Sequence, residues 1–257
     1  MSTYRMWPAQ DQASQMDLDD WADMYAYPAD PPDGWWLRAN MVSTLGGAAV
    51  ASDGLTRDIS SDTDRALLGL LRALSDVIMV GASTAVAERY GPERAHPEHA
   101  HLRAAAGQAP IAAMALVSRS LNLDLSAPIF TAAAVPTILL TVAEAPPDRL
   151  RAAREVADVA LVGATAVDPA LAVAALVERG HRRLLCEGGP RWLATITDAG
   201  LLDELCLTVS PLLLAGKAKR ILDGPEQATP TQMHLAAVCT DSENLFLRYS
   251  RVGDRKI

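Results

Sequence analysis

A short apolar run that ends in a carboxylate, two glycines and a proline has the residue types to hold an anionic ligand. The run is Leu184-Leu185-Cys186, and Glu187-Gly188-Gly189-Pro190 follows it. Glycine lets the backbone approach a ligand closely, and Pro190 suits the first position of a helix. Free N–H groups at a helix start favour a phosphate. The turn predicts a pyrophosphate site with Glu187 beside a substrate; the alternative is a turn whose glycines only permit tight packing.

Two other polar segments also follow runs that are typical of buried strands. Gly81, Ser83 and Thr84 end the run that begins at Asp76, and their backbone N–H groups and the Thr84 hydroxyl can hold a phosphate. Ser118 and Arg119 end the next run, and a hydroxyl beside a guanidinium can also bind a phosphate group. The alternative for both segments is a solvated strand end without a ligand.

The elements that position these segments alternate between strands and helices. Strands are predicted at residues 36–43, 76–81, 110–118, 137–142, 159–162, 183–187 and 204–210, with two more between 235 and 252. Helices are predicted to begin at 60–64 and at 168–169, and to cover 148–157 and 190–199. This alternation indicates an α/β fold with a mostly parallel sheet and an antiparallel C-terminal edge.

Composition narrows the class of protein. The chain has 257 residues, half of them hydrophobic, which favours one large domain. No apolar run is long enough for a membrane span, and the first residues lack a signal pattern, so a cytoplasmic protein is expected. Three cysteines, Cys186, Cys206 and Cys239, lie in apolar runs and are interpreted as buried thiols of a reducing compartment. The net charge of −8 argues against nucleic acid as a partner.

Residues 1–34 form an acidic N-terminal extension to a domain at 35–257. Seven aspartates against Arg5 give the extension a charge of −6 and leave −2 for the rest of the chain. Its large apolar residues, among them Trp7, Trp21 and Tyr25, are too many for a free tail. Part of it is expected to pack on the domain or on a partner subunit; the alternative is a disordered acidic arm.

Four segments, in this order, resemble the reductase domain of riboflavin biosynthesis, a branch of the dihydrofolate-reductase-like fold. They are residues 36–47, then 59–65 with 76–84, then 116–120, then 186–190 with 199–205. The stretch Tyr25-Ala26-Tyr27-Pro28 further resembles stand-alone actinobacterial members of this family. The resemblance implies a three-layer α/β/α fold, a homodimer, and reduction of a C=N bond in a small pyrimidine or pteridine by NADPH. The chain holds no deaminase motif of the type often fused to this reductase.

The resemblance also implies roles for individual residues. Ser118 and Arg119 would bind the 2′-phosphate of NADPH, and the turn at 188–190 would hold its pyrophosphate. Glu187 would be the carboxylate on the substrate side. Asn40 and Ser43 would fall in the substrate pocket, where an amide can pair with a heterocycle edge. Either residue alone could equally tie down a neighbouring backbone.

Gly46 departs from the family pattern, because the family has aspartate there. That aspartate would anchor the heterocycle and help to deliver a proton, which is worth roughly 10²–10⁴ in rate. Asp53 and Asp58 lie nearby in the sequence, but Glu187 is the better remaining candidate for the catalytic group. The main hypothesis is a reductase of a ribosylaminopyrimidine phosphate. Dihydrofolate reduction and a catalytically impaired NADPH-binding protein are the alternatives.

Two basic or histidine-rich loops give weaker signals. His96, His99 and His101 lie close together, but no carboxylate or cysteine frame completes a metal site, so no metal is expected. Lys217, Lys219 and Arg220 could take a substrate phosphate, although a solvated basic loop is the simpler interpretation.

Overall fold

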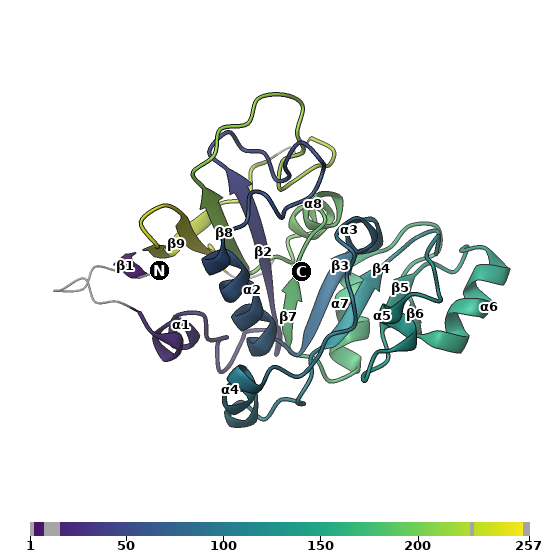
Figure 1. The fold of residues 1–257 in the computed structure, drawn as a ribbon. Helices are drawn as coiled ribbons and strands as arrows, with labels where there is room; N and C mark the ends of the chain where they lie inside the picture. The colour runs from purple at the N-terminus through teal and green to yellow at the C-terminus, as the bar shows by residue number, and fades with distance from the viewer. Residues whose placement is uncertain (1–2, 8–15, 227–228, 254–257) are drawn as a thin grey trace.

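A ten-stranded mixed sheet organises the computed structural model, which describes residues 3–7, 16–226 and 229–253 (Figure 1). Across the sheet the order is β1-β9-β10-β8-β2-β7-β3-β4-β5-β6. The strands are β1 (Tyr4–Trp7), β2 (Trp36–Thr44), β3 (Val77–Gly81), β4 (Ala113–Val117), β5 (Ile138–Thr141), β6 (Asp158–Leu161), β7 (Arg183–Cys186), β8 (Glu204–Ser210), β9 (Met233–Thr240) and β10 (Leu245–Arg251).

The sheet has a parallel part and an antiparallel part. Strands β8, β2, β7, β3, β4, β5 and β6 pair in parallel. Strands β10 and β9 add antiparallel beyond β8, and β1 adds antiparallel to β9. This confirms the predicted mostly parallel sheet with antiparallel C-terminal strands, and it adds an outermost strand from the N-terminal extension.

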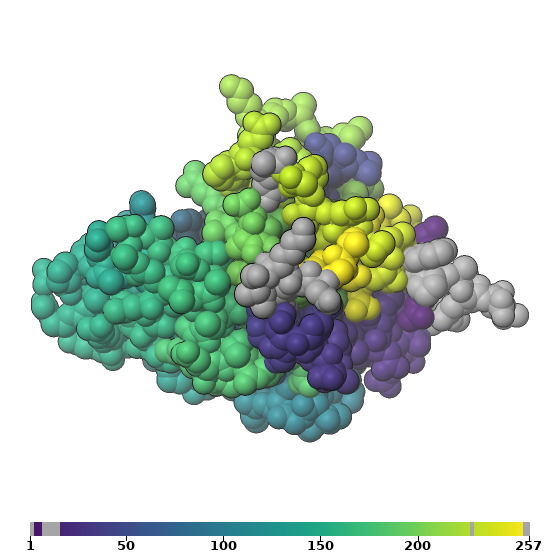
Figure 2. All heavy atoms as spheres, turned by 180° about the vertical axis from the view of Figure 1, so that it is seen from behind, coloured from purple at the N-terminus to yellow at the C-terminus, as the bar shows by residue number. Residues whose placement is uncertain are grey.

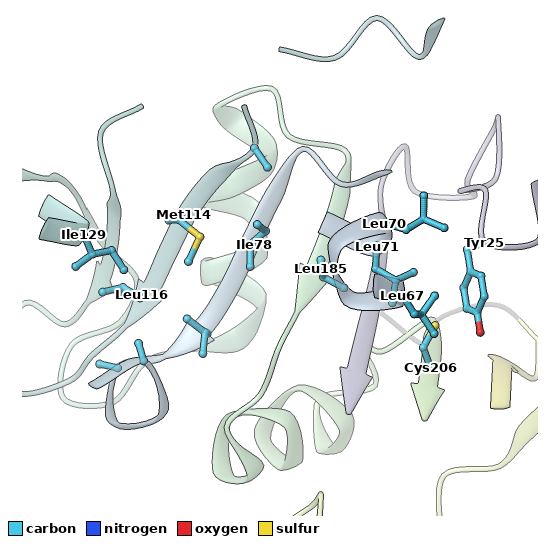
Figure 3. Close-up of a cluster of buried hydrophobic side chains, with 14 of the residues drawn as sticks. Tyr25, Leu67, Leu70, Leu71, Ile78, Met114, Leu116, Ile129, Leu185 and Cys206 are labelled. Carbon is cyan, nitrogen blue, oxygen red and sulfur yellow. The ribbon is translucent and has the colours of Figure 1, made fainter. Parts of the chain in front are cut away.

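Helices cover both faces of the sheet, which confirms the three-layer arrangement. They are α1 (Leu18–Met24), α2 (Asp62–Leu74), α3 (Ala82–Ala87), α4 (Ala100–Ala105), α5 (Pro128–Thr131), α6 (Pro147–Val156), α7 (Pro169–Glu178) and α8 (Pro190–Asp198), with a 3₁₀ turn at Pro97–His99. Alternate strand residues enter two separate cores: Ile78 packs with the α2 side, and Met79 with the α7 and α8 side. Figure 3 shows the first core, where the leucines of α2 face Leu185 and Cys206.

The N-terminal extension is part of the first core. Trp21 of α1 stacks on Tyr25, with ring centroids 5.7 Å apart, and meets Phe246 of β10 edge-on at 5.5 Å. Tyr25 is 1% exposed. The prediction that part of the extension packs on the domain is therefore confirmed for α1 and Tyr25; the side chain of Trp7 lies outside the described residues. The division of the chain at residue 34 stays a prediction.

The three cysteines are buried and free. Burial raises the pKa of Cys186 to about 12 and that of Cys239 to about 11, so neither thiol is a ready nucleophile. Among the described residues, every helix is too short or too polar to cross a bilayer.

Candidate functional site

A pocket of about 580 Å³ opens where the parallel strands β2, β7 and β3 end. Crevices at the carboxyl ends of parallel strands are the usual ligand sites of open α/β sheets. The first turn of α2, helix α3 and two loops complete the walls, and backbone hydrogen bonds join these loops, with Ala49 N–H donating to the carbonyl of Lys219 at 2.8 Å. The lining residues used below are Asn40, Ser60, Asp64, Ser83, Thr84, Tyr90, Glu187, Gly189, Pro190, Lys217 and Lys219.

The diglycine turn packs against the start of α3, so two of the predicted cofactor segments are adjacent. Gly81 N–H donates to the carbonyl of Gly188 at 2.9 Å. Gly188 has a φ of +83°, which favours glycine. A Cβ on Gly189 would clash with Thr84 Oγ1, so a larger residue there would require the Thr84 side chain to move. The first N–H groups of α8 receive no side-chain cap, which leaves them available to an anion.

The third predicted cofactor segment lies at the same sheet edge, outside the pocket lining. Gly81 and Val117 are register partners, which puts Ser118 and Arg119 just beyond β4 and beside the end of β3. Ser118 is buried, and its Oγ accepts a hydrogen bond from Leu121 N–H at 3.1 Å. Arg119 is exposed. The same edge of the sheet thus carries an exposed guanidinium after β4, with β3 between it and the glycine turn that follows β7.

Glu187 is held by two side chains that the sequence interpretation did not connect with it. Arg72 of α2 donates to both carboxylate oxygens, from Nε and Nη2, at 2.7 Å each. The Tyr90 hydroxyl donates to Oε2 at 2.6 Å. Glu187 is 7% exposed. Every oxygen of this carboxylate therefore has a partner, and its position is fixed.

The surroundings of Glu187 shift the pKa values of Arg72 and Tyr90. Burial works against the charged form of Arg72, but the neighbouring Glu187 carboxylate outweighs it and raises the Arg72 pKa. Burial, together with the Glu187 charge, raises the pKa of Tyr90 well above its usual value. Arg72 also lies 3.3 Å from Glu93. At physiological pH Arg72 therefore stays a cation and Tyr90 a neutral phenol.

The three residues predicted at the substrate end lie in different places. Asn40 lines the pocket, and its Oδ1 is buried without a hydrogen-bond partner. Ser43 is buried outside the lining and donates to the carbonyl of Thr44 at 2.9 Å. Gly46 also lies outside the lining, and a Cβ there would be 3.0 Å from the carbonyl oxygen of Leu214. The structure therefore brings Asn40 to the pocket together with Glu187, and not Ser43 or Gly46.

Asp64 is a carboxyl group of the pocket that the sequence interpretation missed. It lies at the helix start predicted for residues 60–64, where its N–H donates to Ser61 Oγ at 3.1 Å. However, Asp64 is 6% exposed and lines the pocket. The residue spacing could have predicted this burial. Asp64 precedes Leu67 and Leu71 by three and seven residues, so it lies on the same buried face of α2.

The environment of Asp64 leaves one oxygen unused. Its Oδ2 accepts a hydrogen bond from Ser60 Oγ at 2.6 Å. Its Oδ1 is buried and has no partner within hydrogen-bond distance. Burial raises the pKa of Asp64, while the hydroxyls of Ser60 and the more distant Thr208 act in the opposite direction. A buried acceptor without a partner is costly unless a ligand supplies the donor.

The basic loop and the histidine-rich loop lie in different parts of the structure. Lys217 and Lys219 are exposed at the pocket, where they place positive charge. The histidines lie elsewhere: His96 contacts Glu93 at 3.4 Å, and His99 is buried. In the described part of the chain, no three His, Cys, Asp or Glu side chains are grouped so that they could hold a metal ion.

Known relatives of the chain are reductases. It is 28% identical over 226 residues to the 2,5-diamino-6-ribosylamino-4(3H)-pyrimidinone 5′-phosphate reductase of Methanothermobacter thermautotrophicus, covering 85% of this chain and 99% of that protein. The enzyme of the same name from Archaeoglobus fulgidus is 27% identical, covering 74% of this chain and 86% of the relative.

Solved structures show the same fold. A pyrimidine reductase-like protein from Corynebacterium diphtheriae superposes with a TM-score of 0.79 at 25% identity, covering 91% of this chain and 99% of the other. The riboflavin biosynthesis reductase of Saccharomyces cerevisiae has a TM-score of 0.61 at 13% identity, covering 85% of this chain and 90% of the other.

The sequence model described as the RibD C-terminal domain matches residues 35–247, which is most of the chain. This match confirms the resemblance carried by the four sequence segments. The chain therefore belongs to the RibD C-terminal domain family, the oxidoreductases that act as reductases in riboflavin biosynthesis.

Proposed function

We propose that this oxidoreductase uses NADPH to reduce the C=N form of a ribosylaminopyrimidine phosphate. The observation that carries the proposal is one pocket in which a glycine turn at a helix start meets two unsatisfied acceptors, Asn40 Oδ1 and Asp64 Oδ1. The first feature suits a nucleotide phosphate and the second suits a heterocycle with N–H groups. The names of the relatives support a pyrimidine substrate.

The residues at the sheet edge fit NADPH. The uncapped N–H groups at Gly189 and the start of α8 would hold the pyrophosphate, with the Thr84 hydroxyl beside them. Arg119 would bind the 2′-phosphate, with Ser118 supporting its loop through Leu121. NADPH supplies a hydride when bound. A scaffold that orients it against the substrate can lower the barrier of such a transfer by about 7–11 kcal/mol.

The two carboxylates of the pocket would have separate roles. Asp64, with Asn40, would hold the heterocycle. Glu187 would lie beside the C=N group, where a carboxylate held in place stabilises the protonated, more electrophilic form of that group. Arg72 and Tyr90 would act as positioning residues, because they hold Glu187 in place. Lys217 and Lys219 at the pocket would attract the 5′-phosphate of the substrate.

We also propose a cytoplasmic homodimer. The C-terminal strands have an apolar face that is only partly buried. On β8 the half-buried Leu205, Leu207 and Val209 alternate with fully buried residues. Their register partners on β10 are Tyr249, Leu247 and Leu245. Figure 2 shows the C-terminal strands, in yellow-green and yellow, at the surface. Light scattering should give twice the chain mass, and Leu207→Glu should give a folded monomer. A monomeric wild type would contradict the dimer.

The first experiment is a titration with NADPH and with NADH, followed by tryptophan fluorescence. NADPH should bind more tightly, and Arg119→Ala should abolish the difference because it removes the guanidinium proposed for the 2′-phosphate. Arg154→Ala, an arginine in the last turn of α6, is the control. Turnover is then measured by NADPH absorbance with a ribosylaminopyrimidine phosphate and with dihydrofolate. No binding of either cofactor would overturn the proposal.

A further inference from the structure

We propose that Glu93 is a positioning residue of the reductase site, which acts through Arg72 on the pocket carboxylate Glu187. This inference rests on the proposed function, in which Glu187 lies beside the C=N group of the substrate. Glu93 follows α3 in the chain and is not among the residues that line the pocket. Any effect of Glu93 on the reaction therefore has to pass through another side chain, and its contact with Arg72 identifies that side chain.

The Arg72 guanidinium lies between two carboxylates. On one side, its Nε and Nη2 donate to the two oxygens of Glu187 at 2.7 Å each. On the other side, its Nη1 donates to Glu93 Oε2 at 3.3 Å. All three nitrogens of the planar group are thus engaged. The guanidinium cannot turn in its plane without breaking one of these contacts.

The contact with Glu93 determines how Arg72 holds Glu187. An arginine can bind a carboxylate through Nε and Nη2 or through its two terminal nitrogens. Because Glu93 occupies Nη1, the first arrangement is the one open to Glu187. Loss of Glu93 frees Nη1, so the guanidinium can turn and bind Glu187 through Nη1 and Nη2. Such a turn displaces the Glu187 oxygens from the reacting group, and a misplacement of about 1 Å can cost about 10²-fold in rate.

Glu93 is itself held in place, as a positioning group requires. Its side chain is only 8% exposed, and its Oε1 lies 3.4 Å from His96 Nε2. Tyr90, three residues before Glu93, donates to Glu187 and has its ring centre 5.3 Å from the Arg72 guanidinium carbon. Burial disfavours the Arg72 cation, but Glu187 and, less strongly, Glu93 raise the Arg72 pKa. One short segment after α3 therefore holds the Arg72–Glu187 pair through two side chains.

The test is the rate of hydride transfer in a single turnover, followed by stopped-flow NADPH absorbance with the full-length chain and a ribosylaminopyrimidine phosphate. Glu93→Ala should lower this rate about tenfold, while the dissociation constant of NADPH stays within about twofold of wild type. A folded Glu93→Ala protein with the wild-type rate would overturn this inference and leave the proposed function intact. A wild type that binds NADPH but does not reduce this substrate would overturn the proposed function, and this inference with it.

Glu98→Ala is the matched control. Glu98 also lies 3.4 Å from His96, but its side chain is 58% exposed and its ion-pair partner is His96, not Arg72. This variant should keep the wild-type rate of hydride transfer. An equal loss of rate in Glu98→Ala and Glu93→Ala would assign the effect to the loop around His96 and would overturn the inference.

A double variant shows whether Glu93 acts through Glu187. In a Glu187→Gln background, Glu93→Ala should change the rate by less than about twofold, because the carboxylate that it positions is already absent. A further loss of about tenfold would mean that Glu93 acts independently of Glu187, and it would overturn the inference. A merely structural role of Glu93 predicts that second result, so the double variant separates the two roles.

If Glu93→Ala does not fold, as judged by circular dichroism, Glu93→Gln provides the same test because it keeps the size of the side chain. An amide oxygen lacks the charge that attracts the guanidinium, so the rate of hydride transfer should fall by at least about threefold. The effect should again disappear in the Glu187→Gln background. A folded Glu93→Gln protein with the wild-type rate would overturn the inference.

Discussion

Two buried arginine–glutamate pairs with similar chemistry lie in different surroundings. The Arg38–Glu204 pair joins β2 to β8, and both side chains are fully buried. The Arg72–Glu187 pair joins α2 to the glycine turn; the arginine side chain is 24% exposed and the carboxylate lines the pocket. The first is sealed by the N-terminal extension, since the Tyr27 ring lies 4.1 Å from the Arg38 guanidinium.

Burial of a charge pair does not by itself indicate a functional site. Glu204 is surrounded by donors from Arg38, Arg248 and Trp36, and it is not among the residues that line the pocket at the strand ends. Although burial raises its pKa, the two arginines outweigh burial and hold the Glu204 pKa below its usual value. Glu187 also accepts hydrogen bonds, from Arg72 and Tyr90, but it lines the pocket, where a ligand can reach it. We therefore expect substitution of Glu204 to lower mainly the free energy of unfolding and substitution of Glu187 to lower mainly kcat/KM.

The largest expected effect is that of Glu204→Gln on stability. The substitution leaves Arg38 fully buried with its main counter-charge removed, and breaking a buried pair in this way costs about 3–5 kcal/mol. Urea denaturation should show this loss in the free energy of unfolding, while kcat of the folded protein stays within about threefold of wild type. A tenfold loss of kcat with unchanged stability would invert the comparison between the two pairs.

Glu187→Gln should give the opposite pattern. The carboxylate beside the C=N group is lost, so kcat/KM should fall by about 10²-fold, which corresponds to about 2.7 kcal/mol. The loss of stability should be smaller than in Glu204→Gln, because Arg72 is partly exposed and retains Glu93. Stopped-flow measurement of NADPH oxidation and urea denaturation of the same sample separate the two quantities. Unchanged turnover would remove Glu187 from the catalytic site.

Local sequence patterns predicted the strands of the domain and the helices α2, α6, α7 and α8, because each of these carries its own signal, and they missed the shorter helices α1, α3, α4 and α5. The helix starts at 60–64 and at 168–169 and the strand before Glu187 all lie where they were expected. Strand β1 was not predicted, because four residues have too little pattern and its pairing with β9 joins opposite ends of the chain. The insertion of β7 between β2 and β3 is likewise a long-range pairing that no local signal encodes.

The candidate site was predicted as single residues and not as contacts. Glu187, Asn40 and the glycine turn were found, because each stands at a strand end with a distinctive residue type. Arg72 and Tyr90 were missed because they reach Glu187 from 115 and 97 residues away. Asp64 was missed because helix capping already accounted for an acid there. Its burial against β8, which sequence spacing alone does not reveal, makes it a group of the pocket.

The contribution of Glu204 to stability depends on pH. The folded-state pKa of Glu204 lies below its usual value, so its stabilising effect is fully present above about pH 4.3, the usual glutamate value, and is lost as the pH falls through the folded pKa. The stability difference between wild type and Glu204→Gln should therefore be constant from pH 8 to 5 and shrink below pH 4. Urea denaturation at several pH values measures it. A difference that grows in acid would contradict the sign.

The smallest expected effects are those of removing the hydroxyl groups of Tyr27 and Tyr90. Tyr27 donates to the carbonyl of Leu184 at 3.3 Å, and Tyr90 donates to Glu187 at 2.6 Å. Tyr27→Phe and Tyr90→Phe each remove one hydrogen bond and keep the ring near an arginine, so each should cost about 0.5–1.5 kcal/mol of stability. Only Tyr90→Phe should also lower kcat/KM, by about tenfold, because only its hydroxyl positions a pocket carboxylate. Equal losses of kcat/KM in the two variants would mean that the Arg38–Glu204 and Arg72–Glu187 pairs do not differ in function.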